Sequence, residues 1–244
     1  MIPHFPTVTR RVKPYIYMKT ILSLLALVVA SAIIPTVHAE TDRASLVTEV
    51  ESCRAILEDF QGASATAIPD QVWQNAKAVV IVNQFKAGLI FGVKGGYGVV
   101  MVKKANGRWS LPALLYANEA SFGLQAGAKT VESVYIMTDS ETPKLLFKQR
   151  VNFGVDAKAV MGPKTADIER NYRPLISNPV LVYTKESGLY AGATVKVAQL
   201  ARNDDAGYIL YNTKYTLPEL LYSDWVQPPS DVLPIMNVVQ KLSP

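Results

Sequence analysis

The chain has 244 residues, of which 25 are Lys or Arg and 20 are Asp or Glu, so its formal net charge is +5. Its two histidines, His4 and His38, both lie before residue 40, and its single cysteine is Cys53. One cysteine excludes an intramolecular disulfide. The absence of histidine beyond residue 38 excludes Ser-His-Asp sites, Cys-His sites and histidine-ligated zinc from the rest of the chain. The composition indicates no cofactor.

The first 39 residues are predicted to be a secretory signal peptide. An apolar run over residues 21–34 is followed by Val37 and Ala39, which fit the small residues before a signal-peptidase cleavage site. The run has fourteen residues, fewer than the roughly 20 that span a bilayer, and an uncleaved anchor is the alternative. Met18 would open a compact signal peptide, so residues 1–17 are interpreted as an upstream mis-start. We expect cleavage after Ala39 and a periplasmic or secreted protein.

The basic character of the chain belongs to this leader. Its four charged residues are all basic, namely Arg10, Arg11, Lys13 and Lys19. Residues 40–244 retain 21 basic and 20 acidic residues, a net charge of +1, so a nucleic-acid partner is not expected. Their length suits one domain that buries a substantial core.

A helix is predicted over residues 41–60, because apolar residues recur there at steps of three and four. Its opposite face carries acidic side chains, namely Glu49, Glu51, Glu58 and Asp59. Residues 71–76 are predicted to add one or two helical turns.

From residue 77 onward the pattern changes to strands. Strands are predicted over residues 78–85, 87–93, 97–104, 108–112, 133–138, 151–160, 179–185 and 189–200. Turns are predicted at residues 94–96, 106–107 and 186–188, where glycine tolerates positive φ. A helix is predicted over residues 141–150, and the longest predicted loop is 164–178. Short helices over residues 216–223 and 230–242 close the chain, the second with Ser230 as its N-cap.

This order of elements predicts an α+β fold. Short turns between successive strands favour a predominantly antiparallel, curled sheet, either a sandwich or barrel-like. An N-terminal amphipathic helix and short C-terminal helices would bracket it.

The motif Gly-Leu-x-x-Gly occurs three times, at Gly88 and Gly92, at Gly123 and Gly127, and at Gly188 and Gly192. Within one strand, positions i and i+4 lie on the same face, so each copy would leave a bare strip of backbone. One interpretation is that the glycines permit bends or tight packing. The other is that the strips line a groove for an acyl chain.

Several motifs resemble, in order and spacing, those of the SYLF-domain family of lipid-binding proteins. They are "KGGYGVV", "WS.P", "GLQAGAK", "MGP" and "SGLYAG", and the resemblance extends roughly from residue 72 to the C-terminus. It implies a secreted bacterial member with a lipid-binding domain. Eukaryotic members are similar modules that bind phosphoinositides at membranes and, in fungi, act on actin.

One segment departs from the family pattern. In eukaryotic members phosphoinositide binding is associated with a basic amphipathic helix near the start of the domain. The matching residues 40–59 hold six acidic residues against Arg43 and Arg54. Phosphoinositide recognition by this helix is therefore not expected.

A basic segment provides candidate headgroup ligands. Between residues 71 and 118 there is no acidic residue, and the basic residues are Lys77, Lys86, Lys94, Lys103, Lys104 and Arg108. On one surface, each would contribute about 1 kcal/mol of attraction to an anionic leaflet. The alternatives are a solvated face without a ligand, or neutralisation by the acidic helix. Tyr97, Trp109 and Tyr116 lie in the same segment, either at a membrane interface or in the core.

The leading hypothesis is an exported, non-enzymatic module that binds phospholipid or a membrane surface through anionic headgroups. The alternative is a structural or interaction protein of the cell envelope with a protein partner. A hydrolase is the third hypothesis, because acidic pairs occur at Asp204 and Asp205 and at Asp167 and Glu169.

Overall fold

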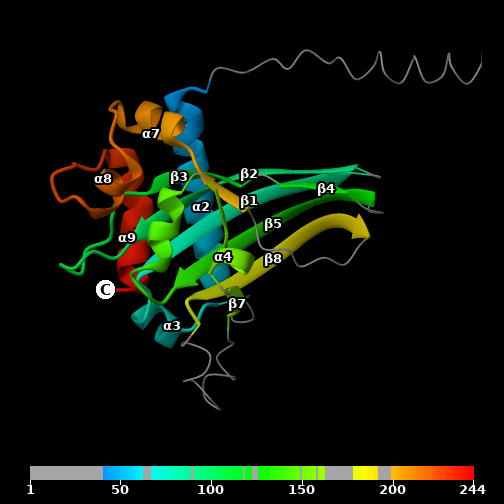
Figure 1. Ribbon diagram of the computed structural model, residues 1–244, viewed down its shortest axis with the longest axis horizontal. Helices are drawn as coiled ribbons and strands as arrows, with labels where there is room; N and C mark the ends of the chain where they lie inside the picture. Colours follow the sequence, from blue (N-terminus) through cyan, green and yellow to red (C-terminus); the bar gives the residue numbers. More distant parts are fainter. Residues whose placement is uncertain are drawn as a thin grey trace, which may run out of the picture. The chain divides into compact units, whose positions relative to one another are not determined.

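The computed structural model describes residues 41–62, 67–88, 91–117, 119–122, 126–148, 150–157, 159–162, 178–191 and 199–244 (Figure 1). The predicted leader lies outside these residues. Among the described helices, none is both long and apolar enough to cross a membrane.

Helix α2 (Arg43–Gly62) confirms the predicted N-terminal helix. Asp42 caps its start, because the Asp42 Oδ1 accepts a hydrogen bond from the Ser45 main-chain N–H at 2.7 Å. The apolar stripe of the helix is buried against the sheet, with Leu46, Val50, Cys53, Ile56, Leu57 and Phe60 inaccessible to solvent. Helix α3 (Asp70–Gln74) follows as the short helix expected there.

The described strands form one nine-stranded sheet. They are β1 (Ala78–Gly88), β2 (Phe91–Val102), β3 (Ala113–Ala117), β4 (Glu119–Phe122), β5 (Ala126–Met137), β6 (Arg150–Asn152), β7 (Ala159–Met161), β8 (Val180–Ala191) and β9 (Gln199–Arg202). Their order is β6-β9-β3-β2-β1-β5-β8-β7, and β4 also pairs with β2. Every pairing is antiparallel except β7 with β8. The predicted α+β class with a mostly antiparallel sheet is confirmed.

The sheet curls toward a barrel. Strands β6 and β7 are its two edges, yet only residues 153–158, including α4 (Phe153–Asp156), separate them in sequence. A linker of six residues spans at most about 20 Å, far less than the width of a flat sheet of eight adjacent strands at about 4.8 Å each. The two edges must therefore approach each other.

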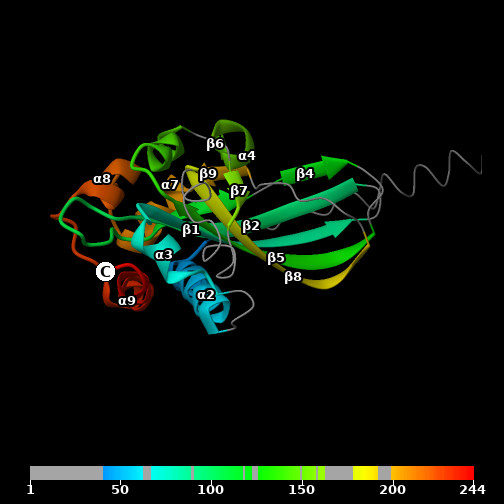
Figure 2. The same cartoon turned by 90° about the horizontal axis from the view of Figure 1, so that it is seen from below.

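Both faces of the central strands are buried. On β1, Val79 and Ile81 face a core that includes α2, α7 (Asp204–Tyr211) and α9 (Leu233–Leu242). Ala78, Val80 and Val82 face a second core that includes the 3-10 helix η1 (Thr142–Phe147) and α8 (Leu217–Tyr222). Figure 2 shows α2 and α9 on one side of the sheet and α4 on the other.

Two predicted turns are wrong, because the residues lie inside long strands. Residues 94–96 belong to β2, where a Cβ added at Gly96 would lie 2.1 Å from the Asn83 main-chain oxygen. Glycine there permits close approach to β1 rather than a reversal of the chain. Residues 186–188 belong to β8, and pairing with β5 continues through them, for example between Ser187 and Thr130. Long-range pairing overrides the local turn preference at this position.

Other boundaries also differ from the prediction. Residues 108–112 do not form a strand, although Trp109 makes an isolated β-bridge with Lys103. The strand in this region is β3. Residues 151–160 divide into the end of β6, α4 and the start of β7. The predicted helix over 141–150 is the shorter η1, and α7 was not predicted. Residues 164–177 of the longest predicted loop lie outside the described residues.

The two C-terminal helices are confirmed, but one predicted cap is wrong. Thr216 and Glu219 form a reciprocal capping box at the start of α8. Ser230 does not cap α9, because residues 230–232 form the 3-10 helix η2 (Ser230–Val232) and Val232 is the N-cap.

Candidate functional site

The structure divides the six predicted headgroup residues into two groups. Lys77 precedes β1, while Lys103, Lys104 and Arg108 follow β2, so these four lie at the same end of the sheet. Lys86 pairs in register with Lys94 and lies nine residues along the chain from Lys77, about 30 Å at the usual rise of a strand. One compact surface therefore cannot contain all six residues.

The turn over residues 103–108, which we call the basic turn, has a defined backbone. Gly107 adopts a φ of +79°, and its N–H donates to the Lys104 carbonyl at 2.9 Å. The Asn106 side-chain oxygen accepts a hydrogen bond from the Arg108 N–H at 3.0 Å. Asn followed by Gly suits this geometry, because Asn bonds to its own backbone and Gly tolerates positive φ. The predicted turn at residues 106–107 is confirmed.

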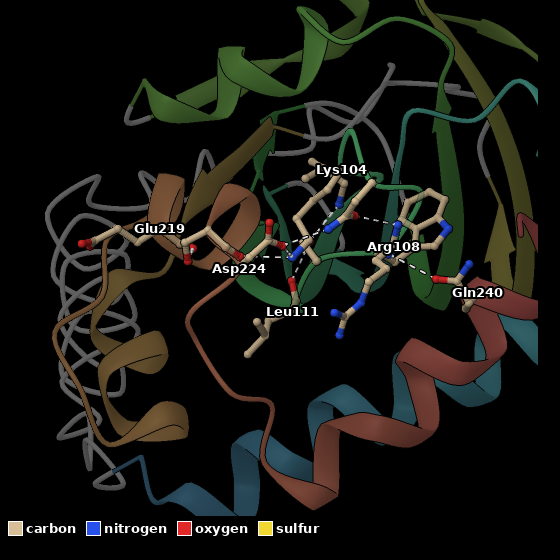
Figure 3. Close-up of polar contacts among 11 residues, drawn as sticks. Lys104, Arg108, Leu111, Glu219, Asp224 and Gln240 are labelled. Atoms are coloured by element: carbon tan, nitrogen blue, oxygen red, sulfur yellow. Dashed lines mark hydrogen bonds and ion pairs between the residues drawn. The ribbon is translucent and has the colours of Figure 1, made fainter.

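Lys104 fastens the basic turn to the segment after α8 (Figure 3). Its ammonium donates to Asp224 Oδ1 at 2.5 Å and to the Ser223 carbonyl at 3.1 Å, and 10% of its side chain is exposed. Asn106 donates a further hydrogen bond to Asp224 at 3.2 Å. The hydrogen bond from Lys104 holds the pKa of Asp224 below its ordinary value. Lys104 is therefore both a structural contact and a source of positive charge.

Lys103 lies at the start of the basic turn, close to Lys77. Its ammonium donates to Ser243 Oγ at 3.4 Å and to the main-chain oxygen of Pro244. Burial, and then the nearby charge of Lys77, lower the pKa of Lys103. Lys77 and Arg108 are both exposed. Lys77 and Arg108 thus expose positive charge to solvent, while Lys103 and Lys104 bind other segments of the chain and hold the turn in place.

Trp109 belongs to the core rather than to an exposed interface. Its indole N–H donates to the Ser243 carbonyl at 2.8 Å, and its main-chain N–H donates to the Gln240 side chain at 3.3 Å. Gln240 donates in turn to the Gly107 carbonyl at 3.5 Å. These contacts attach the end of α9 to the basic turn, and Figure 3 shows Gln240 of α9 beside this turn.

The two tyrosines singled out in the sequence lie on the face of the sheet that carries α2. The Tyr97 hydroxyl donates to Ser52 Oγ on α2 at 2.9 Å and accepts from Asn83 Nδ2 at 3.1 Å. Tyr116 pairs with Tyr97 in register and is exposed. Neither tyrosine belongs to the basic turn.

Two exposed aromatic residues lie beside the basic turn and were not predicted from the sequence as site residues. Trp225 is 57% exposed and Tyr222 is 38% exposed, and they flank the Ser223 and Asp224 that bind Lys104. We call residues 222–225 the aromatic loop. Two amphipathic aromatic residues at the C-terminal end of a predicted helix and just beyond it were the available signal for it.

The far end of the sheet holds the remaining lysines and several of the repeated glycines. Lys86 pairs in register with Lys94 on β2 and with Lys129 on β5. Lys129 was not singled out in the sequence; its side chain is buried and lies 2.6 Å from the Glu186 carboxylate. Side-chain placement is not described for Lys86 and Lys94.

The glycine motifs do not each lie within one strand. Gly88 ends β1 and pairs in register with Gly92 on β2, so the first copy spans two neighbouring strands. Gly88 also pairs with Gly127 on β5, which places three glycines in one row across the sheet. Gly188 lies on β8 opposite Lys129. Gly123 and Gly192 lie outside the described residues.

The acidic face of α2 is paired elsewhere rather than with the basic turn. Arg54 forms ion pairs with Glu51 at 2.9 Å and with Glu58 at 2.8 Å. Asp59 pairs with Lys185 on β8. Among the described residues, these ion pairs of α2 do not involve the basic turn, so they do not neutralise its positive charge.

Of the other candidate reactive groups, the structure describes Asp204, Asp205 and Cys53. Asp204 and Asp205 lie in the first turn of α7, and Asp204 pairs with Arg202 at 2.6 Å. Asp167 and Glu169 lie outside the described residues. Burial raises the pKa of the Cys53 thiol well above its ordinary value. Among the described residues, no three His, Cys, Asp or Glu side chains gather to hold a metal ion.

Comparison with known proteins identifies related chains. The family model Ysc84, described as Las17-binding protein actin regulator, matches residues 118–242. An SH3 domain-containing protein of Schizosaccharomyces pombe is 27% identical over 192 residues, which cover 75% of this chain and 45% of the relative. LAS seventeen-binding protein 3 of Saccharomyces cerevisiae is 24% identical over 204 residues, 80% of this chain and 44% of the relative.

A human relative, SH3 domain-containing YSC84-like protein 1, is 24% identical over 190 residues, 75% of this chain and 56% of its own length. The chain thus spans about half the length of the curated relatives it matches. No solved structure matches the chain.

Proposed function

Given that the chain belongs to the Ysc84 family, we propose that it is a non-enzymatic module that binds anionic membrane surfaces through its basic turn. The grouping of Lys77, Lys103 and Arg108 at one end of the sheet carries this proposal. Burial, and then repulsion from the nearby Lys77, lower the pKa of Lys103. An anionic headgroup near both ammonium groups would relieve that repulsion.

Helix α2 is an unsuitable membrane contact in this protein. Its six apolar residues at the sheet are buried, and burying a side chain of this kind stabilises the fold by roughly 1.5–3 kcal/mol. Extracting the helix would forfeit roughly 10 kcal/mol, which is comparable with the whole stability of a domain. Docking through the basic turn and the neighbouring Lys77 needs no such rearrangement, because Lys77 and Arg108 are already exposed.

The proposal includes export. Residues 1–39 have the layout of a signal peptide, so the protein would act in the periplasm or outside the cell. N-terminal sequencing of protein recovered from its own cells should begin at Glu40. A first residue at Met1 or Met18 would contradict export with cleavage.

Vesicle flotation tests membrane binding. The purified protein should float with vesicles of phosphatidylcholine and phosphatidylglycerol, and high salt should release it. Replacing both exposed basic residues, as in Lys77→Gln with Arg108→Gln, should weaken binding about 25-fold, about fivefold for each charge. Lys185→Gln is the control, because it removes a lysine far from the basic turn. Lys185 lies on β8, in the same row across the sheet as Asn83, which is six residues along the chain from Lys77. A wild-type protein that ignores both neutral and anionic vesicles would refute the proposal.

Binding of a protein partner is the second candidate function. One relative is named for binding LAS seventeen, and the family model is described as Las17-binding. For this chain we propose a partner in the cell envelope only as the alternative. A protein that co-purifies at fixed stoichiometry, together with indifference to vesicles, would favour it.

A further inference from the structure

We propose that Tyr222 and Trp225 enter the bilayer interface when the protein docks, so that the aromatic loop and the basic turn form one membrane-binding surface. This inference rests on the proposed function and names the side chains that would touch lipid. Trp225 is 57% exposed, whereas the other two tryptophans, Trp73 and Trp109, are 0% and 3% exposed. The protein therefore presents one tryptophan to solvent.

The aromatic loop holds its two rings outward in fixed positions. Leu221 and Val226, immediately before and after the loop, are buried. The Trp225 ring packs edge-on against Tyr215, with ring centroids 4.9 Å apart. The Tyr222 ring packs edge-on against Phe147 at 6.0 Å. Because both rings are supported from behind, they can contact a partner with little loss of side-chain freedom.

The loop is joined directly to the positive charge of the basic turn. Lys104 binds both residues between the two aromatic side chains, Ser223 through its carbonyl and Asp224 through its carboxylate. Arg108 lies close enough to Asp224 to contribute to lowering the pKa of that carboxyl group. The aromatic rings and the cations therefore meet a partner together.

Two acidic groups close to this surface are paired with lysines. Asp224 is paired with Lys104 at 2.5 Å. Glu141, which lies near Tyr222, is paired with Lys144 at 2.6 Å. Lys77 and Arg108 add exposed positive charge, so the surface is complementary to a negatively charged one.

An anionic bilayer suits this combination. Trp and Tyr favour the boundary between headgroups and acyl chains, since each has an apolar ring and a polar N–H or O–H group. Nearby Lys and Arg add attraction to anionic lipid. In Figure 1 the segment after α8 lies at the edge of the described domain, at the end opposite β4. Two rings displayed at such an edge can enter an interface without a matching groove.

Tryptophan fluorescence tests the inference directly. Adding phosphatidylcholine–phosphatidylglycerol vesicles should shift the emission to shorter wavelength and reduce quenching by acrylamide. Vesicles that contain brominated phosphatidylcholine should quench the emission. Trp225→Phe should abolish these changes, because the two remaining tryptophans are buried.

A variant pair separates insertion from general surface properties. Tyr222→Ala with Trp225→Ala should weaken vesicle binding about tenfold or more, as expected when buried aromatic area is removed. Phe85→Ala is the control, because Phe85 is equally exposed at 55% but lies on β1, about 25 Å along the strand from Lys77. It should leave binding unchanged. Circular dichroism checks that each variant is folded.

The outcomes distinguish this inference from the proposed function. Lipid quenching of Trp225 together with loss of affinity in the double variant supports the inference. If the wild type floats with anionic vesicles while Trp225 stays open to acrylamide, the inference is wrong and the proposed function stands. If the wild type does not bind vesicles, both fail. A third variant, Phe85→Trp combined with Trp225→Phe, should remain open to acrylamide on vesicles, and its protection would overturn the inferred orientation.

Discussion

Replacing Asp224 by asparagine should strengthen binding to anionic vesicles. Asp224 places a negative charge against the basic turn, where its Oδ1 accepts hydrogen bonds from Lys104 at 2.5 Å and from Asn106 at 3.2 Å. Asparagine keeps an oxygen that accepts hydrogen bonds. The aromatic loop should therefore stay in place while the surface becomes more positive by one charge.

The size of the effect follows from the change in charge. One additional basic residue near an anionic leaflet contributes about 1 kcal/mol, which corresponds to about a fivefold change in affinity. Removing one acidic charge at the same place shifts the local charge equally, so we expect about fivefold tighter binding. Titration with phosphatidylcholine–phosphatidylglycerol vesicles, followed by sedimentation, measures it. The difference from wild type should shrink as salt is raised.

Asp59→Asn is the matched control. Asp59 also pairs with a lysine, Lys185, and Lys185 lies in the cross-strand row of Asn83. That row is six residues along β1 from Lys77, about 20 Å, well beyond the Debye length of about 8 Å at physiological salt. Its affinity should match wild type. Unchanged or weaker binding by Asp224→Asn, or equal gains in both variants, would refute docking through the basic turn.

Three further predictions concern stability and reactivity. Gly98→Ala should destabilise the fold by about 1–3 kcal/mol, because an added Cβ would lie 2.5 Å from a main-chain oxygen of β1. Gly62→Ala is the control and should not destabilise the fold, because no atom lies within 4 Å of the added Cβ. Urea unfolding measures both effects. Cys53 should resist iodoacetamide until the protein unfolds, since burial raises its pKa. The pKa of Asp231 is lowered by the hydrogen bond from Arg43, so this pair stabilises the fold above the unfolded value of about 3.9. The pair contributes up to about 1 kcal/mol, and this contribution should be lost as the pH falls through the folded pKa of Asp231. Unfolding curves measured between about pH 5 and 2 should show this loss for the wild type but not for Asp231→Asn.

Periodicity predicted the elements whose faces are cleanly divided between core and solvent. Helix α2 has one buried stripe and one acidic face, so its limits could be predicted to within two residues. The turn at residues 106–107 was also predictable, because Gly107 has the positive φ that glycine favours. The predominance of antiparallel pairing followed from the short connections.

Glycine misled the strand boundaries where its role is packing between strands. Gly96, at the end of the predicted turn over residues 94–96, lies inside β2, where an added Cβ would meet the backbone of β1. Gly188 lies inside β8, which pairs with β5 on both sides of it. The sequence shows the glycine but not the neighbouring strand that approaches it. A local turn signal therefore could not be distinguished from close packing.

The candidate site was predictable in composition but not in arrangement. The six basic residues could be identified from the sequence. Their separation into two groups at opposite ends of the sheet depends on the strand register, which pairs Lys86 with Lys94. Trp109 and Trp225 are the same residue type, but only the second is exposed. That difference arises because Trp109 packs under α9 and donates to the Ser243 carbonyl, a contact between residues 134 positions apart.

Amide hydrogen exchange of the protein with and without anionic vesicles is the most direct test of docking through the basic turn. Vesicles should slow exchange in the basic turn, residues 103–108, and in the aromatic loop, residues 222–225. Helix α2 should keep its protection, because its apolar face stays in the core. Faster exchange along α2, or new protection confined to the opposite end of β1 near Phe85, would contradict it.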